Sequence, residues 1–74
     1  MMLNENMTML FVADWGTVHA FDQDRKMIWS RSELGGFVAY LKNCIDGVLT
    51  LEIEIEINGP LNTVRLSAKD GTLL

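Results

Sequence analysis

Apolar and polar residues alternate strictly along the segment Leu49–Ile57, LTLEIEIEI. Side chains of a β-strand point alternately to its two faces, so this period of two predicts one long strand with an apolar face and an acidic face. Residues 62–68, NTVRLSA, alternate in the same way, and the intervening Asn58-Gly59-Pro60-Leu61 is typical of a turn. The two segments are therefore predicted to form a hairpin.

A four-residue loop would set the register of this hairpin. It would place Ile53 opposite Leu66 on the apolar face and Glu54 opposite Arg65 on the polar face. Because a slip of one residue would turn the apolar set outward, the agreement along both faces supports this pairing. Asp70-Gly71 predicts a further turn, with residues 72–74 as a short closing strand.

Three shorter apolar segments come earlier in the chain and predict an antiparallel meander. Tight turns at Asp14-Trp15-Gly16 and Gln23-Asp24 would join them, and a two-residue loop at the second turn would place Val18 opposite Trp29. The predicted strands are residues 7–13, 17–22 and 26–31.

The apolar period changes over residues 33–45, where spacings of three and four predict an amphipathic helix. Ser32 would be its N-cap and Gly47 its C-cap. Gly35-Gly36 weakens the prediction, because each glycine costs about 1 kcal/mol relative to alanine in a helix. A competing interpretation makes residues 37–41 a strand. The apolar residues are Leu34, Phe37, Val38, Leu41, Cys44 and Ile45.

These elements predict a single α+β domain over residues 1–74. One antiparallel sheet of five strands, or six with residues 72–74, would carry one helix packed on its apolar face, in the order β-β-β-α-β-β. The glutamate face of the long strand would then point to solvent or to a partner.

Composition narrows the expected location and partners. The 74 residues include one cysteine, Cys44, which cannot form an internal disulfide, so we expect a reducing compartment and predict a cytoplasmic protein. The first ten residues lack the basic region of a signal peptide, and no apolar run approaches the ~20 residues of a membrane span. The net charge of −4 argues against direct binding of nucleic acid and suits a basic protein partner.

No set of residues has the spacing of a catalytic or metal site. His19 is the only histidine and has no ligand-spaced companion, and Cys44 would be a buried structural thiol on the helix. Gly35-Gly36 lacks the other residues of a phosphate-binding loop. We therefore predict that the protein is not an enzyme and holds no cofactor or metal.

The acidic row of the long strand is the most distinctive surface feature. Its glutamates would lie about 6.8 Å apart, a regular negative row that resembles the phosphates of duplex DNA. Such a row could enter the basic groove of a nucleic-acid-binding protein. Trp15 and Tyr40 add interface-type aromatic side chains. The predicted partner-binding residues are Glu52, Glu54, Glu56, Asp14, Trp15 and Tyr40.

These features predict a small acidic binding protein that acts by protein–protein contact on a larger, basic protein. A phage-encoded inhibitor of a host defence or nucleic-acid enzyme, or an immunity protein, has this general character. The alternative is a structural module that works as a homodimer or larger homo-oligomer, with an exposed strand edge for self-pairing and the glutamates serving only solubility.

Overall fold

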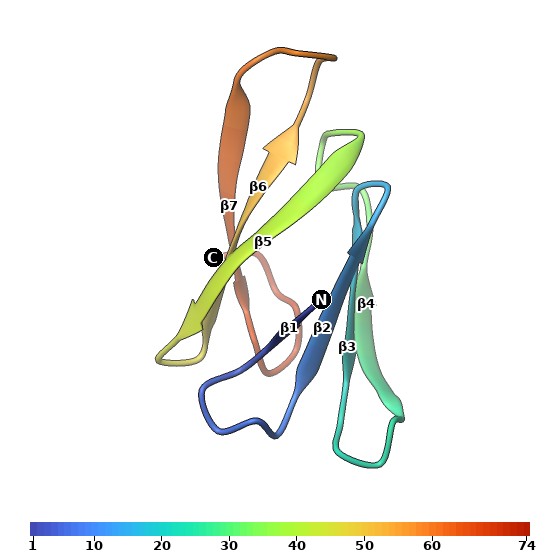
Figure 1. Cartoon of the computed structure of the whole chain (residues 1–74), viewed down its shortest axis with the longest axis vertical. Helices are drawn as coiled ribbons and strands as arrows, with labels where there is room; N and C mark the ends of the chain where they lie inside the picture. Colours follow the sequence, from blue (N-terminus) through green and yellow to red (C-terminus); the bar gives the residue numbers. More distant parts are fainter.

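The computed structural model describes residues 1–74 and consists of strands and loops. The strands form two antiparallel sheets, β1-β2-β3-β4 and β5-β6-β7, which pack against each other as a small sandwich (Figure 1). The chain has no helix long and apolar enough to cross a lipid bilayer. The strands are β1 (Met2–Leu3), β2 (Leu10–Asp14), β3 (Thr17–Phe21), β4 (Met27–Arg31), β5 (Val38–Ile45), β6 (Val48–Glu54) and β7 (Leu61–Ser67).

The helix predicted over residues 33–45 is wrong: residues 33–37 are part of the loop before β5, and the rest of the segment is β5. The predicted α+β class is therefore wrong as well, and the protein is all-β. A β-bulge explains the misleading period. The pairing of β5 with β6 shifts between Leu41 and Asn43, so one extra residue sits on β5. The inward-facing residues are then Ala39, Leu41 and Cys44, and their spacing of two followed by three imitates a helical repeat.

The turn after β5 gave a second misleading signal. Asp46 and Gly47 both have positive φ, 52° and 77°, and they connect the paired residues Ile45 and Val48. Two consecutive positive φ angles define the type I′ turn of a tight hairpin, for which Asp-Gly is a preferred sequence. The glycine that was interpreted as a helix C-cap is therefore a hairpin residue. The competing interpretation, a strand over residues 37–41, was closer to the structure.

The β6–β7 hairpin forms, but with a different register from the predicted one. Ile53 lies opposite Asn62, whereas the prediction placed it opposite Leu66. The slip is four residues, an even number, so the apolar residues still face inward. The predicted Glu54–Arg65 pair is wrong, because Arg65 lies opposite Thr50.

The N-terminal meander is confirmed in outline, with β1 as an additional edge strand. The β3–β4 loop is longer than predicted, since the Asp22 N–H donates to the Lys26 carbonyl at 2.9 Å and Arg25 adopts a φ of 64°. This change of register pairs Trp29 with Ala20, not with Val18. It places Trp29 against the core between the two sheets.

The core lies between the sheets and receives side chains from both. Its large, fully buried members are Phe11, Val18, Leu49, Leu51, Ile53 and Leu66. Trp29 closes one side of this core: its ring centroid lies 6.1 Å from that of Phe11, and its Nε1 donates to the Ala68 carbonyl at 2.9 Å. The turn after β7 covers the same ring, because Gly71 lies directly against it.

We predict that Gly71→Ala destabilises the fold more than Gly47→Ala does. The two glycines have nearly equal φ, 76° and 77°, so both substitutions carry the left-handed backbone cost of about 1–2 kcal/mol. A Cβ at position 71 would also lie 2.6 Å from the Trp29 ring, whereas one at position 47 would meet nothing within 4 Å. This overlap should cost a further ~1–3 kcal/mol.

Urea unfolding followed by tryptophan fluorescence measures both free energies of unfolding. Equal losses in the two variants would contradict the packing of the C-terminal turn on Trp29.

Candidate functional site

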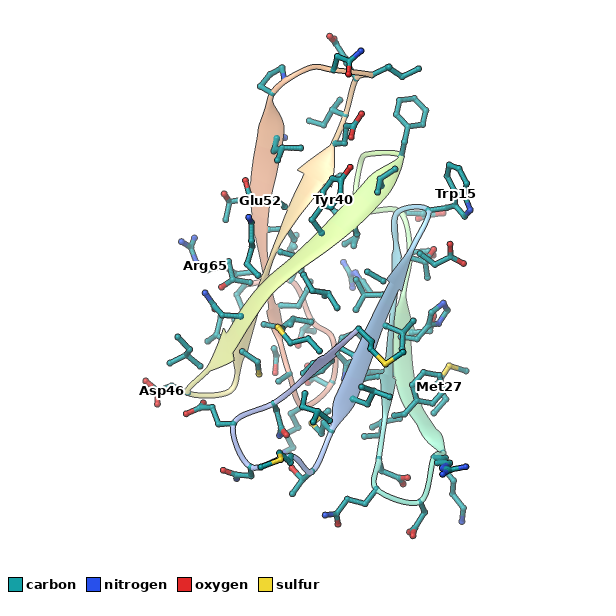
Figure 2. The ribbon with its side chains drawn as sticks, viewed as in Figure 1. Trp15, Met27, Tyr40, Asp46, Glu52 and Arg65 are labelled. Atoms are coloured by element: carbon teal, nitrogen blue, oxygen red, sulfur yellow. The ribbon has the colours of Figure 1, made fainter.

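The predicted partner-binding residue Glu52 lies in the centre of the outer face of the β5-β6-β7 sheet (Figure 2). Its carboxylate forms a salt bridge with the Lys42 Nζ at 2.8 Å, and its side chain is only 25% exposed. Lys42 is the extra residue of the β5 bulge, so the irregularity that breaks the alternation also supplies the cation that neutralises Glu52. Glu52 is therefore a poor contact residue for a basic partner.

Glu54 follows on the same face and has a different partner. Tyr40 lies on β5, not on a helix flank, and its hydroxyl donates to Glu54 Oε2 at 3.0 Å. This hydrogen bond, together with the negative charge of Glu54, raises the pKa of Tyr40, because ionisation would remove the donor and place two anions together. Tyr40 and Glu54 thus form a paired unit that remains exposed to solvent on the tyrosine side.

The predicted row of three strand glutamates is interrupted. β6 ends at Glu54, so Glu56 belongs to the loop that follows and is exposed. Arg65 lies on the same outer face as Glu52, since its cross-strand neighbour Thr50 is two residues from Glu52 (Figure 2). The outer face of the sheet therefore carries Lys42 and Arg65 together with Glu52 and Glu54, and does not form the uniform negative row of a nucleic-acid mimic.

Asp14 and Trp15 belong to the tight turn between β2 and β3, in which Gly16 has a φ of 81°. The Trp15 side chain is 80% exposed, so it does not plug the end of the core. The turn rests against the linker that precedes β5, because a Cβ at Gly16 would lie 2.6 Å from the Gly36 carbonyl oxygen. A Cβ at Gly16 would also lie 3.6 Å from the Phe37 carbonyl oxygen, so the turn adjoins Phe37, whose N–H donates to the Glu54 carbonyl at 2.8 Å.

Four further apolar residues at this end were not among the predicted contact residues. Phe37 is 57% exposed and Ile57 is 82% exposed, and Ile55 and Leu61 are exposed as well. Figure 1 shows why: the β6–β7 hairpin projects beyond the four-stranded sheet, which leaves its tip uncovered. We name this surface the apolar end; it comprises Trp15, Phe37, Tyr40, Ile55, Ile57 and Leu61.

The chain segments that form the apolar end are acidic. These segments, residues 14–17, 31–37 and 54–61, contain four acidic residues against one basic residue, Arg31, a net charge of −3. The acidic residues are Asp14, Glu33, Glu54 and Glu56. Five of the six predicted partner-binding residues are thus located at this end or on its border, and Glu52 is the exception.

A shallow hollow of about 450 Å³ opens on the outer face beside the apolar end. Tyr40, Lys42 and Glu54 line it from the sheet, and Asn58, Gly59 and Leu61 line it from the hairpin tip. Enzyme and cofactor sites usually bury most of their ligand in an enclosed, mainly apolar cleft. This hollow is instead shallow and of mixed polarity.

The other candidate chemical groups have structural surroundings. Cys44 is buried, as predicted, although on a strand; its burial and the nearby Glu5 carboxylate raise the pKa of the thiol, which favours the unreactive form. His19 Nδ1 lies 3.0 Å from Ser30 Oγ on the neighbouring strand. The structure contains no group of three or more His, Cys, Asp or Glu side chains that could hold a metal ion.

Comparison with protein-family models, with curated proteins and with solved structures gives no match for this chain. The candidate site therefore rests on its geometry and chemistry alone.

We predict that Glu54→Gln lowers the pKa of Tyr40 towards its ordinary value. The substitution removes the neighbouring negative charge and weakens the acceptor of the tyrosine hydroxyl, which are the two main causes of the raised pKa. Because Tyr40 is the only tyrosine, its ionisation can be followed directly by ultraviolet absorbance during an alkaline titration.

The matched control is Glu56→Gln, which removes the same charge from a residue with no hydrogen bond to Tyr40. A titration midpoint that moves equally in both variants would contradict the pairing of Tyr40 with Glu54.

Proposed function

We propose that this protein is a small, non-catalytic binding protein that attaches through its apolar end to a larger, basic protein. Inhibitors and immunity-type proteins that block a nucleic-acid enzyme or a defence enzyme are the class that fits this description. The proposal rests chiefly on one observation: six of the fourteen exposed large apolar side chains belong to the apolar end, and the segments that form it carry four carboxylates, of which only Glu54 has a side-chain hydrogen bond.

The exposed aromatic residues favour a protein-binding surface over a set of isolated exposed residues with no function. Isolated exposed apolar residues are common on soluble proteins, whereas contiguous patches mark interaction sites. Trp15 and Tyr40 are of the residue types that most often dominate binding energy. Trp15 also sits in a tight turn that is held by backbone contacts with Gly36, so little of its surroundings must be ordered on binding.

Charge supports a basic partner. Exposed carboxylates around an apolar centre accelerate association with a positively charged surface and disfavour other partners. Of the four carboxylates, only Glu54 has a side-chain hydrogen bond, and that bond comes from Tyr40, which is neutral at pH 7. We place the complex in the cytoplasm, where the free thiol of Cys44 would remain reduced.

Self-association is the second candidate, and a different surface favours it. The outer edge of β4 has no partner strand, and its residues Met27 and Ile28 are 58% and 45% exposed. A second copy could pair along this edge. The apolar end suits a second copy less well, because two ends of charge −3 would repel each other. Light scattering decides between the two candidates: a stable dimer favours self-association, and a monomer favours a separate partner.

We predict that the double variant Trp15→Ser and Ile57→Ser abolishes capture of a basic partner while leaving the fold intact. Both side chains are at least 80% exposed, so their loss should change the free energy of unfolding by less than ~0.5 kcal/mol. Loss of two central interface residues typically weakens a complex by ~2 kcal/mol or more. Immobilised wild type and variant, each exposed to extract of the source cell, provide the comparison.

The matched control is Met27→Ser, an exposed apolar residue of β4 that lies away from Trp15 (Figure 2). A protein that binds wild type and Met27→Ser, is lost with the double variant and dissociates as salt is raised would support the proposal. If all three immobilised proteins capture the partner equally, or if they capture only an acidic protein, binding of a basic partner through the apolar end is contradicted.

A further inference from the structure

The two halves of the chain are connected by side chains and a short linker, and no backbone hydrogen bond joins them. We call residues 1–31 the first half and residues 38–74 the second half. All 36 backbone–backbone hydrogen bonds join residues of the same half. Two side-chain hydrogen bonds cross between the halves, from Trp29 to the Ala68 carbonyl and from the Asp46 N–H to Glu5. In Figure 1 the strands coloured blue to green form one sheet, and those coloured yellow-green to red form the other.

Each half buries its apolar face against the other half. The core contains no buried polar or charged side chain, so its stability comes from apolar burial, which is not directional. A half therefore gains the same burial from the complementary half of a second copy as from that of its own chain. The buried side chains are Phe11, Val18 and Ala20 from the first half and Leu49, Leu51, Ile53 and Leu66 from the second.

The linker, residues 32–37, is bent back by two left-handed residues. Glu33 has a φ of 59° and Gly35 a φ of 90°. The left-handed region is unfavourable for a residue with a side chain, so an extended linker would relieve the strain at Glu33. Six extended residues span about 20 Å, whereas packed sheets lie about 10 Å apart. An extended linker is therefore long enough to carry the second half away from the first.

We propose that two copies of this chain exchange their second halves by opening the linker. The product is a dimer of two sandwiches, each built from the first half of one chain and the second half of the other. In the closed monomer the linker keeps the halves at an effective concentration in the millimolar range. The monomer therefore dominates at lower protein concentrations, and exchange is favoured near or above that concentration or by a linker that resists bending.

The exchange also changes the composition of the apolar end, which draws on both halves. Trp15 belongs to the first half, whereas Tyr40, Ile55 and Ile57 belong to the second. In the exchanged dimer each apolar end joins Trp15 of one chain to Tyr40, Ile55 and Ile57 of the other. A partner bound there contacts both chains, and the dimer presents two such ends.

Two full-length variants that cannot fold alone test the exchange. Leu51→Asp and Phe11→Asp each place a carboxylate at a fully buried position, one in each half. The Leu51→Asp chain keeps an intact first half and the Phe11→Asp chain an intact second half, so only an exchanged pair can complete a sandwich. The Leu51→Asp chain is labelled with ¹⁵N, and the two chains are refolded together from urea at about 1 mM.

The Trp29 indole reports the result, because its N–H bond to Ala68 joins the two halves. We expect hydrogen exchange of this N–H, followed by nuclear magnetic resonance, to be slower by about tenfold or more in the mixture than in the labelled chain alone. The indole of the exposed Trp15 is the internal reference. The matched control mixes the labelled chain with Leu49→Asp, which damages the same half as Leu51→Asp. Equal Trp29 exchange in the two mixtures would overturn the proposal.

A second measurement uses variants that keep both halves intact. Gly35→Val penalises the positive φ of the closed linker, whereas an extended linker accepts valine. We expect the dimerisation constant after refolding to rise by about fivefold for each of the two linkers, and thus by about 25-fold in total. The matched control is Gly47→Val, whose φ of 77° and free surroundings resemble those of Gly35, but which lies within the second half, so its strain is the same in monomer and dimer.

Size-exclusion chromatography with light scattering, over a series of refolding concentrations, measures both constants. Equal constants for the two variants would overturn the proposal. A Gly35→Val dimer that dissociates as soon as it is diluted in native buffer would overturn it as well, because exchanged halves must first leave their shared cores. Neither measurement involves a basic partner, so failure of the proposed function leaves the exchange of halves standing, and the reverse holds too.

Discussion

The two sheets of this protein share no strand, so the packing between them determines whether the fold exists. Two side-chain hydrogen bonds cross between them: Trp29 donates to the Ala68 carbonyl, and the Asp46 N–H donates to a Glu5 carboxylate oxygen. The rest of the attachment is apolar burial around Phe11, to which Trp29 adds its ring. Because the chain is short, its core is small, and we expect a small free energy of unfolding.

Much of the strand content was predictable, and the failure of the helix prediction has a local cause. Alternation identified β6 and β7, and short apolar segments bounded by turn residues identified β2, β3 and β4. It failed at β5, where the bulge at Lys42 changes the phase and two patterns fit the same residues. The Asp46-Gly47 pair was the decisive signal available in the sequence, since Asp-Gly between apolar residues favours a type I′ hairpin turn.

The candidate site was predicted in its aromatic part and missed in its aliphatic part. Trp15 was conspicuous in the sequence because a large ring in a tight turn has no core to enter. Ile55 and Ile57 continue the alternation of β6 and were taken as core residues. Their exposure depends on where the opposite sheet ends, a property of the partner sheet and not of the strand itself. The pairing of Glu52 with Lys42 required the bulge, which the sequence did not reveal.

Each sheet is built from one uninterrupted half of the chain, residues 2–31 for the first and 38–67 for the second. Every ladder within a sheet joins strands that follow each other in sequence, so forming it closes only short loops. Distant residues meet only when the finished halves dock about the Gly35-Gly36 linker. We therefore expect the hairpins to form before the two halves dock, because docking closes the longer chain separations, 39 residues between Trp29 and Ala68 and 41 between Glu5 and Asp46.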